Sequence, residues 1–124
     1  MYEIRTVTRR GNSLAVVIPP YFSPPQNPLV YLAAKFIAYS EVFPLSDDLV
    51  GFKGVIGKVK LRKLVYKNKV RLMYTIPVEA VGALRLKEGD RVLLLRYSIG
   101  GEPLIIVYPD PPLSKIMAPL VLNR

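Results

Sequence analysis

The 124-residue sequence predicts a mainly β protein with short helices. Two stretches of similar outline carry this prediction: RRGNSLAVVIPP from Arg9 to Pro20, and KNKVRLMYTIPV from Lys67 to Val78. In each, a basic loop precedes an alternating apolar segment that leads into proline, which is typical of a strand with one buried face. Because the outline occurs twice, we interpret the chain as two versions of one small unit that share a core.

The composition favours a polyanionic partner. The chain has 18 basic and 9 acidic residues, a formal charge of +9, and 51% of its residues are hydrophobic. A domain this basic typically binds nucleic acid or, less commonly, an acidic membrane surface. The lack of cysteine and the scarcity of Asn and Gln also fit a thermophilic source.

Several function classes are disfavoured by missing residue types. The sequence has no cysteine, so it can form neither disulfides nor thiolate metal sites. It also has no histidine, which is the usual general base of enzymes. We therefore expect no enzyme activity, no cofactor and no metal. The longest apolar run, Leu29 to Ala38, contains Lys35 and is too short to span a bilayer. We expect a soluble, cytoplasmic, nucleoid-associated protein that does not bind membranes.

The first half is predicted from its turn residues and periodicity. Residues 2–9 favour a strand, Gly11-Asn12 a tight turn, and residues 13–18 a second strand with Leu14, Val16 and Ile18 on its apolar face. The five prolines of residues 19–28 predict an irregular or extended loop. Apolar residues at helical spacing predict a short buried helix over residues 29–39.

The second half starts with the most basic part of the chain. Residues 49–59 suggest a hairpin with Gly54 in its bend, followed by a basic strand and a turn at Lys67-Asn68-Lys69. The remaining elements that we predict are a strand at 70–76, a helix from Pro77 with Val78, Val81 and Leu84 on one side, a turn at 86–90, and a hairpin of strands 91–97 and 104–108.

An internal repeat follows when Ile18-Pro19 is aligned with Ile76-Pro77. This alignment matches Leu14 with Leu72, Val7 with Val65, and Arg9 with Lys67. Because matched positions differ by an even number, each strand keeps its inward and outward faces. The predicted units are a divergent first half with a proline-rich insertion (1–57), a second half (58–109) and an apolar, proline-rich tail (110–124).

RRGNSLAVVIP and TIPVEAVGALRLKEGDRVLLL together resemble the AbrB, SpoVT and MazE family of swapped-hairpin domains. The shared pattern is a basic residue, a glycine-containing turn, a strand ending in Ile-Pro, a short helix, Leu-x-x-Gly-Asp and another strand. The resemblance covers residues 61–109 well. In the first copy it covers the chain to Pro19, and LSDDLVGF is interpreted as a remnant of the Leu-x-x-Gly-Asp turn. The second loop departs from the pattern because it lacks glycine.

The resemblance implies a swapped-hairpin β-barrel built from two tandem βαββ-type repeats, an intramolecular pseudo-dimer. It also implies a transcriptional regulator that binds double-stranded DNA through basic first strands and loops. The alternative is an antitoxin that binds DNA and holds a toxin with its tail. A homodimer of barrels, supported by the apolar tail, is left open.

The candidate DNA-binding residues are the cations and small polar residues of the two loops and their flanking strands. They are Arg5, Arg9, Arg10, Asn12, Ser13, Lys58, Lys60, Arg62, Lys63, Lys67, Asn68, Lys69 and Arg71. The alternative for the cations is a solvated face, and for Asn12 it is turn chemistry.

Other residues are assigned structural roles. Tyr66 and Tyr74 are interpreted as core or strand-pair aromatics rather than as stacking platforms. Gly100-Gly101 predicts a hairpin turn rather than a phosphate cradle. The acids Asp47, Asp48, Glu88 and Asp90 are assigned to caps and turns rather than to a metal site.

Overall fold

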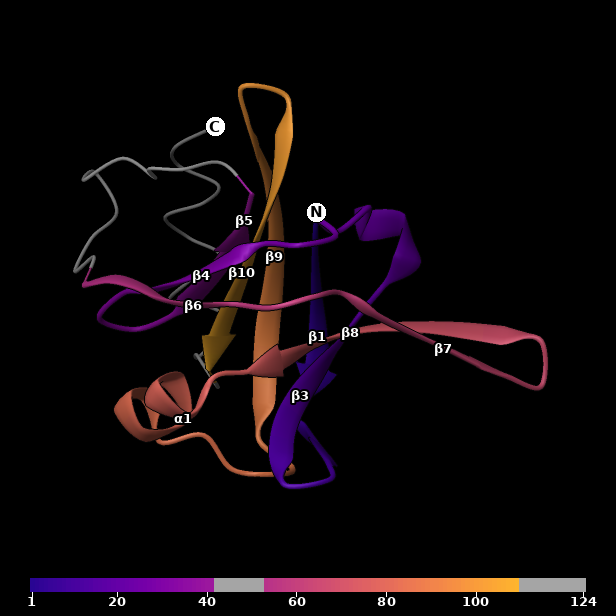
Figure 1. The fold of residues 1–124 in the computed structure, drawn as a ribbon, viewed down its shortest axis with the longest axis horizontal. Coiled ribbons are helices and arrows are strands. Elements are labelled where there is room, and N and C mark those ends of the chain that lie inside the picture. Colours follow the sequence, from indigo (N-terminus) through magenta and orange to yellow (C-terminus); the bar gives the residue numbers. More distant parts are fainter. Residues whose placement is uncertain (42–52, 110–124) are drawn as a thin grey trace.

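The computed structural model describes residues 1–41 and 53–109. The chain is mainly antiparallel β-structure with one short α-helix, as the sequence predicts (Figure 1). The elements are β1 (Tyr2–Thr6), β2 (Thr8–Arg10), β3 (Ser13–Ile18), η1 (Pro20–Phe22), β4 (Leu29–Leu32), β5 (Ile37–Ser40), β6 (Gly54–Lys58), β7 (Arg62–Tyr66), β8 (Lys69–Ile76), α1 (Val78–Leu84), β9 (Arg91–Ile99) and β10 (Glu102–Pro109).

The strands of the described residues pair into two sheets. One has six strands in the order β1-β9-β10-β5-β4-β6, and the other has four in the order β2-β3-β8-β7. The main hydrophobic cluster takes residues from both sheets, including Val16 and Tyr74 from the smaller and Tyr39 and Leu94 from the larger. A second cluster lies on strands of the six-stranded sheet alone. The two sheets therefore share one core, and the smaller sheet keeps one face turned away from it.

Any antiparallel pair of strands has local two-fold axes, and the repeat alignment selects one of them in the central pairing of the four-stranded sheet. Leu14 pairs with Ile76, and Ile18 pairs with Leu72. The alignment matches Leu14 with Leu72 and Ile18 with Ile76. If each residue is replaced by its match, the Leu14–Ile76 pair becomes the Leu72–Ile18 pair. Val16 pairs with Tyr74, its own equivalent, so a local two-fold axis passes through this pair.

The outer strands follow a different alignment. Arg9 lies opposite Leu14, and Lys63 lies opposite Leu72, the residue that the repeat alignment matches with Leu14. By position in the sheet, Arg9 is therefore equivalent to Lys63 and not to Lys67. The predicted equivalences of Val7 with Val65 and of Arg9 with Lys67 are therefore wrong. Val7 corresponds instead to Leu61, and both side chains are buried. The alignment assumed hairpins of equal length, but the second hairpin is two residues longer on each strand.

The predicted helix over residues 29–39 is also wrong, because this segment forms the β4–β5 hairpin. Strand β4 also pairs with β6, so its backbone is bonded on both sides. Nearly every residue of β4 and β5 is buried, which gives continuous apolar runs without the alternation of a half-exposed strand. Such runs cannot be told from a buried helix by periodicity.

Two further predictions on the first half change. The predicted first strand is divided at Val7, where the chain passes from one sheet to the other; the Val7 amide donates to Asp90 O at 2.8 Å. Gly54 does not form a hairpin bend but begins β6. The predicted turn at Asp47 and Asp48, the whole LSDDLVGF remnant (45–52) and the first part of the predicted hairpin (49–52) lie outside the described residues.

The proline-rich segment connects strands of the two different sheets. Ten residues (19–28) connect β3 to β4, whereas fourteen (77–90) connect β8 to β9. The short 3-10 turn η1 stands where the second half has α1. The helix itself is confirmed: it begins after Pro77 and buries Ala80, with Val81 and Leu84 partly buried and Val78 exposed.

Two buried tyrosines join the sheets at the local axis. The rings of Tyr39 and Tyr74 stack with centroids 4.4 Å apart and planes 9° apart. The Tyr39 hydroxyl donates to Thr75 O at 3.1 Å, and the Tyr74 hydroxyl donates to Pro25 O. Burial raises the pKa of both phenols far above the ordinary value of 10.0, so both stay neutral. Tyr74 thus also anchors the proline-rich segment.

Candidate nucleic-acid interface

Strands β7 and β8 form a two-stranded ribbon that extends away from the body of the molecule (Figure 1). Its turn is Lys67-Asn68, whose φ angles are 48° and 63°. Positive φ at both central residues is the pattern of a type I′ turn, whose twist matches that of the flanking strands. The ribbon therefore has a regular hairpin turn although its loop lacks glycine.

The turn of the β2–β3 hairpin differs. Gly11 has a φ of 61°, while Asn12 has an ordinary negative φ. This is the pattern of a type II′ turn, in which glycine takes the first central position. Asn12 is therefore not required for its backbone conformation.

Cross-strand pairs show which side chains of the four-stranded sheet share a face. The face opposite the core carries Arg10 on β2, Arg62 on β7, and Lys69 and Arg71 on β8. All four side chains are exposed. We call this surface the cationic face.

The cationic face is hollowed between the ribbon and the end of β2. A shallow cavity of about 470 Å³ is lined by Arg10, Leu64, Val65, Tyr66, Lys69 and Arg71. The structure thus brings Arg10 to the same hollow as Lys69 and Arg71, two cations from the other half of the sequence. The three cations that line this cavity favour an anionic ligand such as a phosphate group.

The charge of the ribbon is not neutralised within the described residues. The sequence has no acid from Lys53 to Val78. The ion pairs found among the described residues join Arg5 to Glu3 and Arg9 to Glu88, and neither involves the ribbon. Five cations, Arg62, Lys63, Lys67, Lys69 and Arg71, therefore remain available for an external anion.

The ribbon also exposes apolar side chains near its tip. Val65 is 66% exposed and Tyr66 is 71% exposed. Tyr66 pairs with Lys69 across the ribbon, and the Lys67 ammonium lies 5.4 Å from the Tyr66 ring centroid. Of the two tyrosines predicted to be core or strand-pair aromatics, Tyr74 is a core residue and Tyr66 is an exposed residue paired across the ribbon. The exposure of Val65 and Tyr66 is not predicted from the sequence, because it depends on how far the hairpin extends. That length is known only once the strand register is known.

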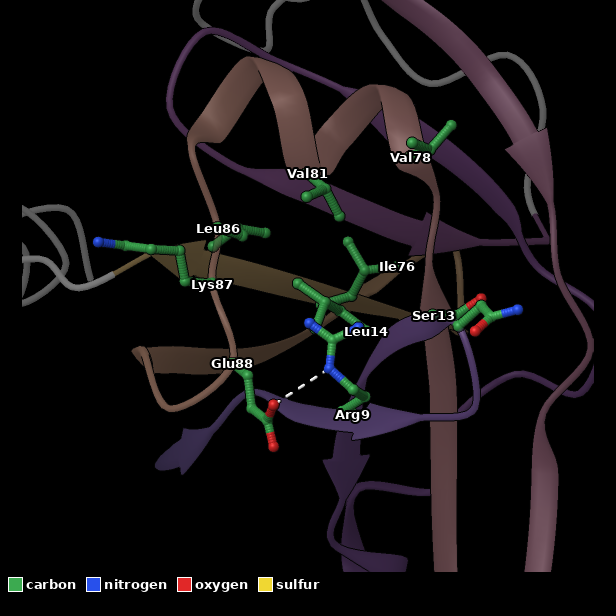
Figure 2. A pocket seen from close by; sticks show the side chains of 10 residues that line it. Arg9, Ser13, Leu14, Ile76, Val78, Val81, Leu86, Lys87 and Glu88 are labelled. Carbon is green, nitrogen blue, oxygen red and sulfur yellow. Dashed lines mark hydrogen bonds and ion pairs between the residues drawn. The ribbon is translucent and has the colours of Figure 1, made fainter.

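Arg9 lies on the other face of the sheet from Arg10. Its Nε donates to Glu88 Oε1 at 3.1 Å across a cavity of about 300 Å³ (Figure 2). Leu14, Ile76, Val81 and Leu86 form the apolar side of this cavity, and Asn12 and Ser13 also line it. The structure therefore separates Arg9 from the cationic face, whereas Ser13 lies opposite Arg10 in the β2–β3 pairing and Asn12 lies in the turn between them. Glu88 acts as an ion-pair partner as well as a turn residue.

Three other candidates lie away from the ribbon. Arg5 is on β1 in the six-stranded sheet, with its Nη2 3.0 Å from the Glu3 carboxylate. Lys58 ends β6 in the same sheet. Lys60 is exposed in the segment that crosses between the sheets, which is fixed by bonds from Val59 N to Pro28 O and from Leu61 N to Gln26 O.

Comparisons with known protein families, with curated proteins and with solved structures found no match to the chain. No group of three or more acidic, histidine or cysteine side chains in the described ranges is placed to hold a metal ion. Within the same ranges, no helix has the length and apolar character needed to cross a bilayer.

Proposed function

We propose that the chain is a DNA-binding protein, a transcriptional regulator, that contacts duplex DNA through the cationic face and the tip of the ribbon. The observation that carries this proposal is the set of five ribbon cations with no acidic partner among the described residues. A solvated surface is usually mixed in sign, whereas a single-sign surface attracts the phosphate backbone.

The strand pairing supports a tandem duplication. The six-stranded sheet reads β1-β9-β10 from one edge and β6-β4-β5 from the other, so each edge strand neighbours a hairpin from the other half of the chain. We propose that β6 corresponds to β1, which moves the start of the second unit from residue 58 to Gly54. This exchange of hairpins is what the resemblance to the AbrB, SpoVT and MazE family implies, and an AbrB-like pseudo-dimer is our proposal for the fold.

The antitoxin alternative gains no support from the structure. It depends on a toxin-binding tail at residues 110–124, which lie outside the described residues. Regulation of transcription through DNA binding needs only the described surface, so we retain it as the proposed function.

The dependence of DNA affinity on salt tests the proposal. If Arg10, Arg62, Lys67, Lys69 and Arg71 each contact a phosphate, the logarithm of the association constant should fall with the logarithm of salt with a slope of about −4.5. Mobility shifts or fluorescence anisotropy with a mixed-sequence duplex measure this slope. Binding that does not change with salt would contradict a phosphate-contacting surface.

Arg9 and Arg10 provide a matched pair of substitutions. They are adjacent and chemically identical, but Arg10 lies on the cationic face and Arg9 is paired with Glu88. We expect Arg10→Gln to weaken binding about eightfold at 0.1 M salt, the loss of one phosphate contact, and Arg9→Gln to change it less than about twofold. The same anisotropy titration measures both, and equal losses would show that face and pairing do not matter.

A further inference from the structure

The two hairpins of the four-stranded sheet reach different distances from the local axis. Strand β8 begins at Lys69, five positions before the axial Tyr74, whereas β3 begins at Ser13, three positions before the axial Val16. At about 3.3 Å per residue, the ribbon extends about 7 Å further than its counterpart. A pseudo-symmetric fold therefore presents two unequal hairpins.

This difference in reach is comparable with the depth of a DNA groove. The major groove of B-DNA is about 8.5 Å deep and about 12 Å wide, and it admits a two-stranded ribbon, while the minor groove is only about 6 Å wide. The longer hairpin also exposes Val65 and Tyr66 near its tip, side chains that can contact bases once inside a groove.

The other hairpin is built differently. Arg9 is held against Glu88 on the core side, and Arg10 reaches the hollow of the cationic face. This end therefore presents one free arginine and a turn that stops close to the body. Such a surface suits contact with the phosphate backbone but not entry into a groove.

We propose that the β7–β8 ribbon is the one element of the described residues that enters a DNA groove. The ribbon tip enters the major groove, and Arg10 contacts the flanking backbone, so the bound DNA site lacks the two-fold symmetry that the pseudo-symmetric fold would suggest. This inference rests on the proposed function, because it specifies how the same surface holds duplex DNA.

A shortened ribbon tests the role of reach. Deleting Val65, Tyr66, Lys69 and Val70 joins Leu64 to Lys67 and Asn68 to Arg71, which keeps the turn and the alternation of both strands. The control is Lys69→Gln, because the deletion also removes that charge. We expect the shortened chain to bind a mixed-sequence duplex about tenfold more weakly than Lys69→Gln does, since both lack the Lys69 phosphate contact and only the shortened chain also loses the groove contacts.

Two further experiments use the intact chain, so they do not depend on the folding of the shortened one. They are competition with groove-binding dyes and selection of binding sites from a random duplex pool. Methyl green, a major-groove ligand, should displace the wild-type chain, netropsin should not, and a random duplex pool should yield a site without two-fold symmetry. Displacement by netropsin alone, a palindromic site, or a folded shortened chain that binds as Lys69→Gln does would overturn the ribbon proposal. The proposed function is overturned instead by a wild-type chain that binds no duplex, or that binds duplex with an affinity independent of salt.

Discussion

Replacing Tyr74 with alanine is expected to lower the free energy of unfolding by about 3–5 kcal/mol, the usual cost of truncating a large buried aromatic residue. The Tyr74 side chain has no exposed surface, stacks on Tyr39 and donates a hydrogen bond to Pro25 O. Its removal leaves a cavity at the local axis, unpairs a backbone carbonyl and releases the proline-rich segment. Chemical denaturation followed by circular dichroism measures the change.

The matched control is Tyr66→Ala. It removes the same side chain from the ribbon, where the ring is 71% exposed and contacts Lys67. An exposed substitution of this kind changes stability by only about 0.5 kcal/mol or less. Similar losses at the two positions would contradict the assignment of Tyr74 to the core.

Tyr74→Phe separates the hydroxyl from the ring. It keeps the stacking on Tyr39 but leaves Pro25 O without its donor, which costs about 1–3 kcal/mol when the carbonyl is buried. The difference between the alanine and phenylalanine variants then gives the contribution of ring packing at the axis.

The parts of the fold that the sequence predicts correctly are those specified by local chemistry. Gly100-Gly101 adopts positive φ at both positions and joins β9 to β10, as a paired-glycine turn between apolar runs indicates. Proline at residue 77 also marks the start of α1, although Pro77 is the N-cap residue and the helix begins one position later, at Val78. The alternation of Leu14, Val16 and Ile18 places one face of β3 in the core.

The errors arise where tertiary contacts decide. Residues 29–39 become a hairpin because β4 and β5 find strand partners on both sides, and burial of both faces removes the alternation that identifies a strand. The longer second hairpin follows from the pairing of Lys63 with Leu72, which composition does not reveal.

The candidate site was predicted in part for the same reason. The basic segment of residues 58–71 is visible in the sequence, and the structure places its residues from Arg62 onward on the ribbon. Whether Arg9 or Arg10 joins that surface depends on which face each takes, and the ion pair with Glu88 depends on a contact between distant parts of the sequence. Charge predicts the type of partner, whereas register determines which charges face it.

Replacing Lys67 and Lys69 together with glutamine is expected to weaken duplex binding about sixtyfold at 0.1 M salt, because each lost phosphate contact accounts for about eightfold. The slope of log affinity against log salt should become shallower by about 2. Both side chains are exposed on the ribbon, one in its turn and one at the start of β8, so the change should leave stability unaltered.

The control for this double variant is Lys35→Gln with Lys53→Gln. These lysines are also exposed, and the substitutions change the net charge by the same amount, but both residues lie outside the four-stranded sheet. If the affinity depends on the position of charge on the ribbon, the control should bind within about threefold of wild type, because long-range attraction is screened beyond about 8–10 Å at this salt. Equal losses in both double variants would mean that net charge alone holds the DNA. The ribbon would then have no special role, since any cationic surface of this chain would serve equally well.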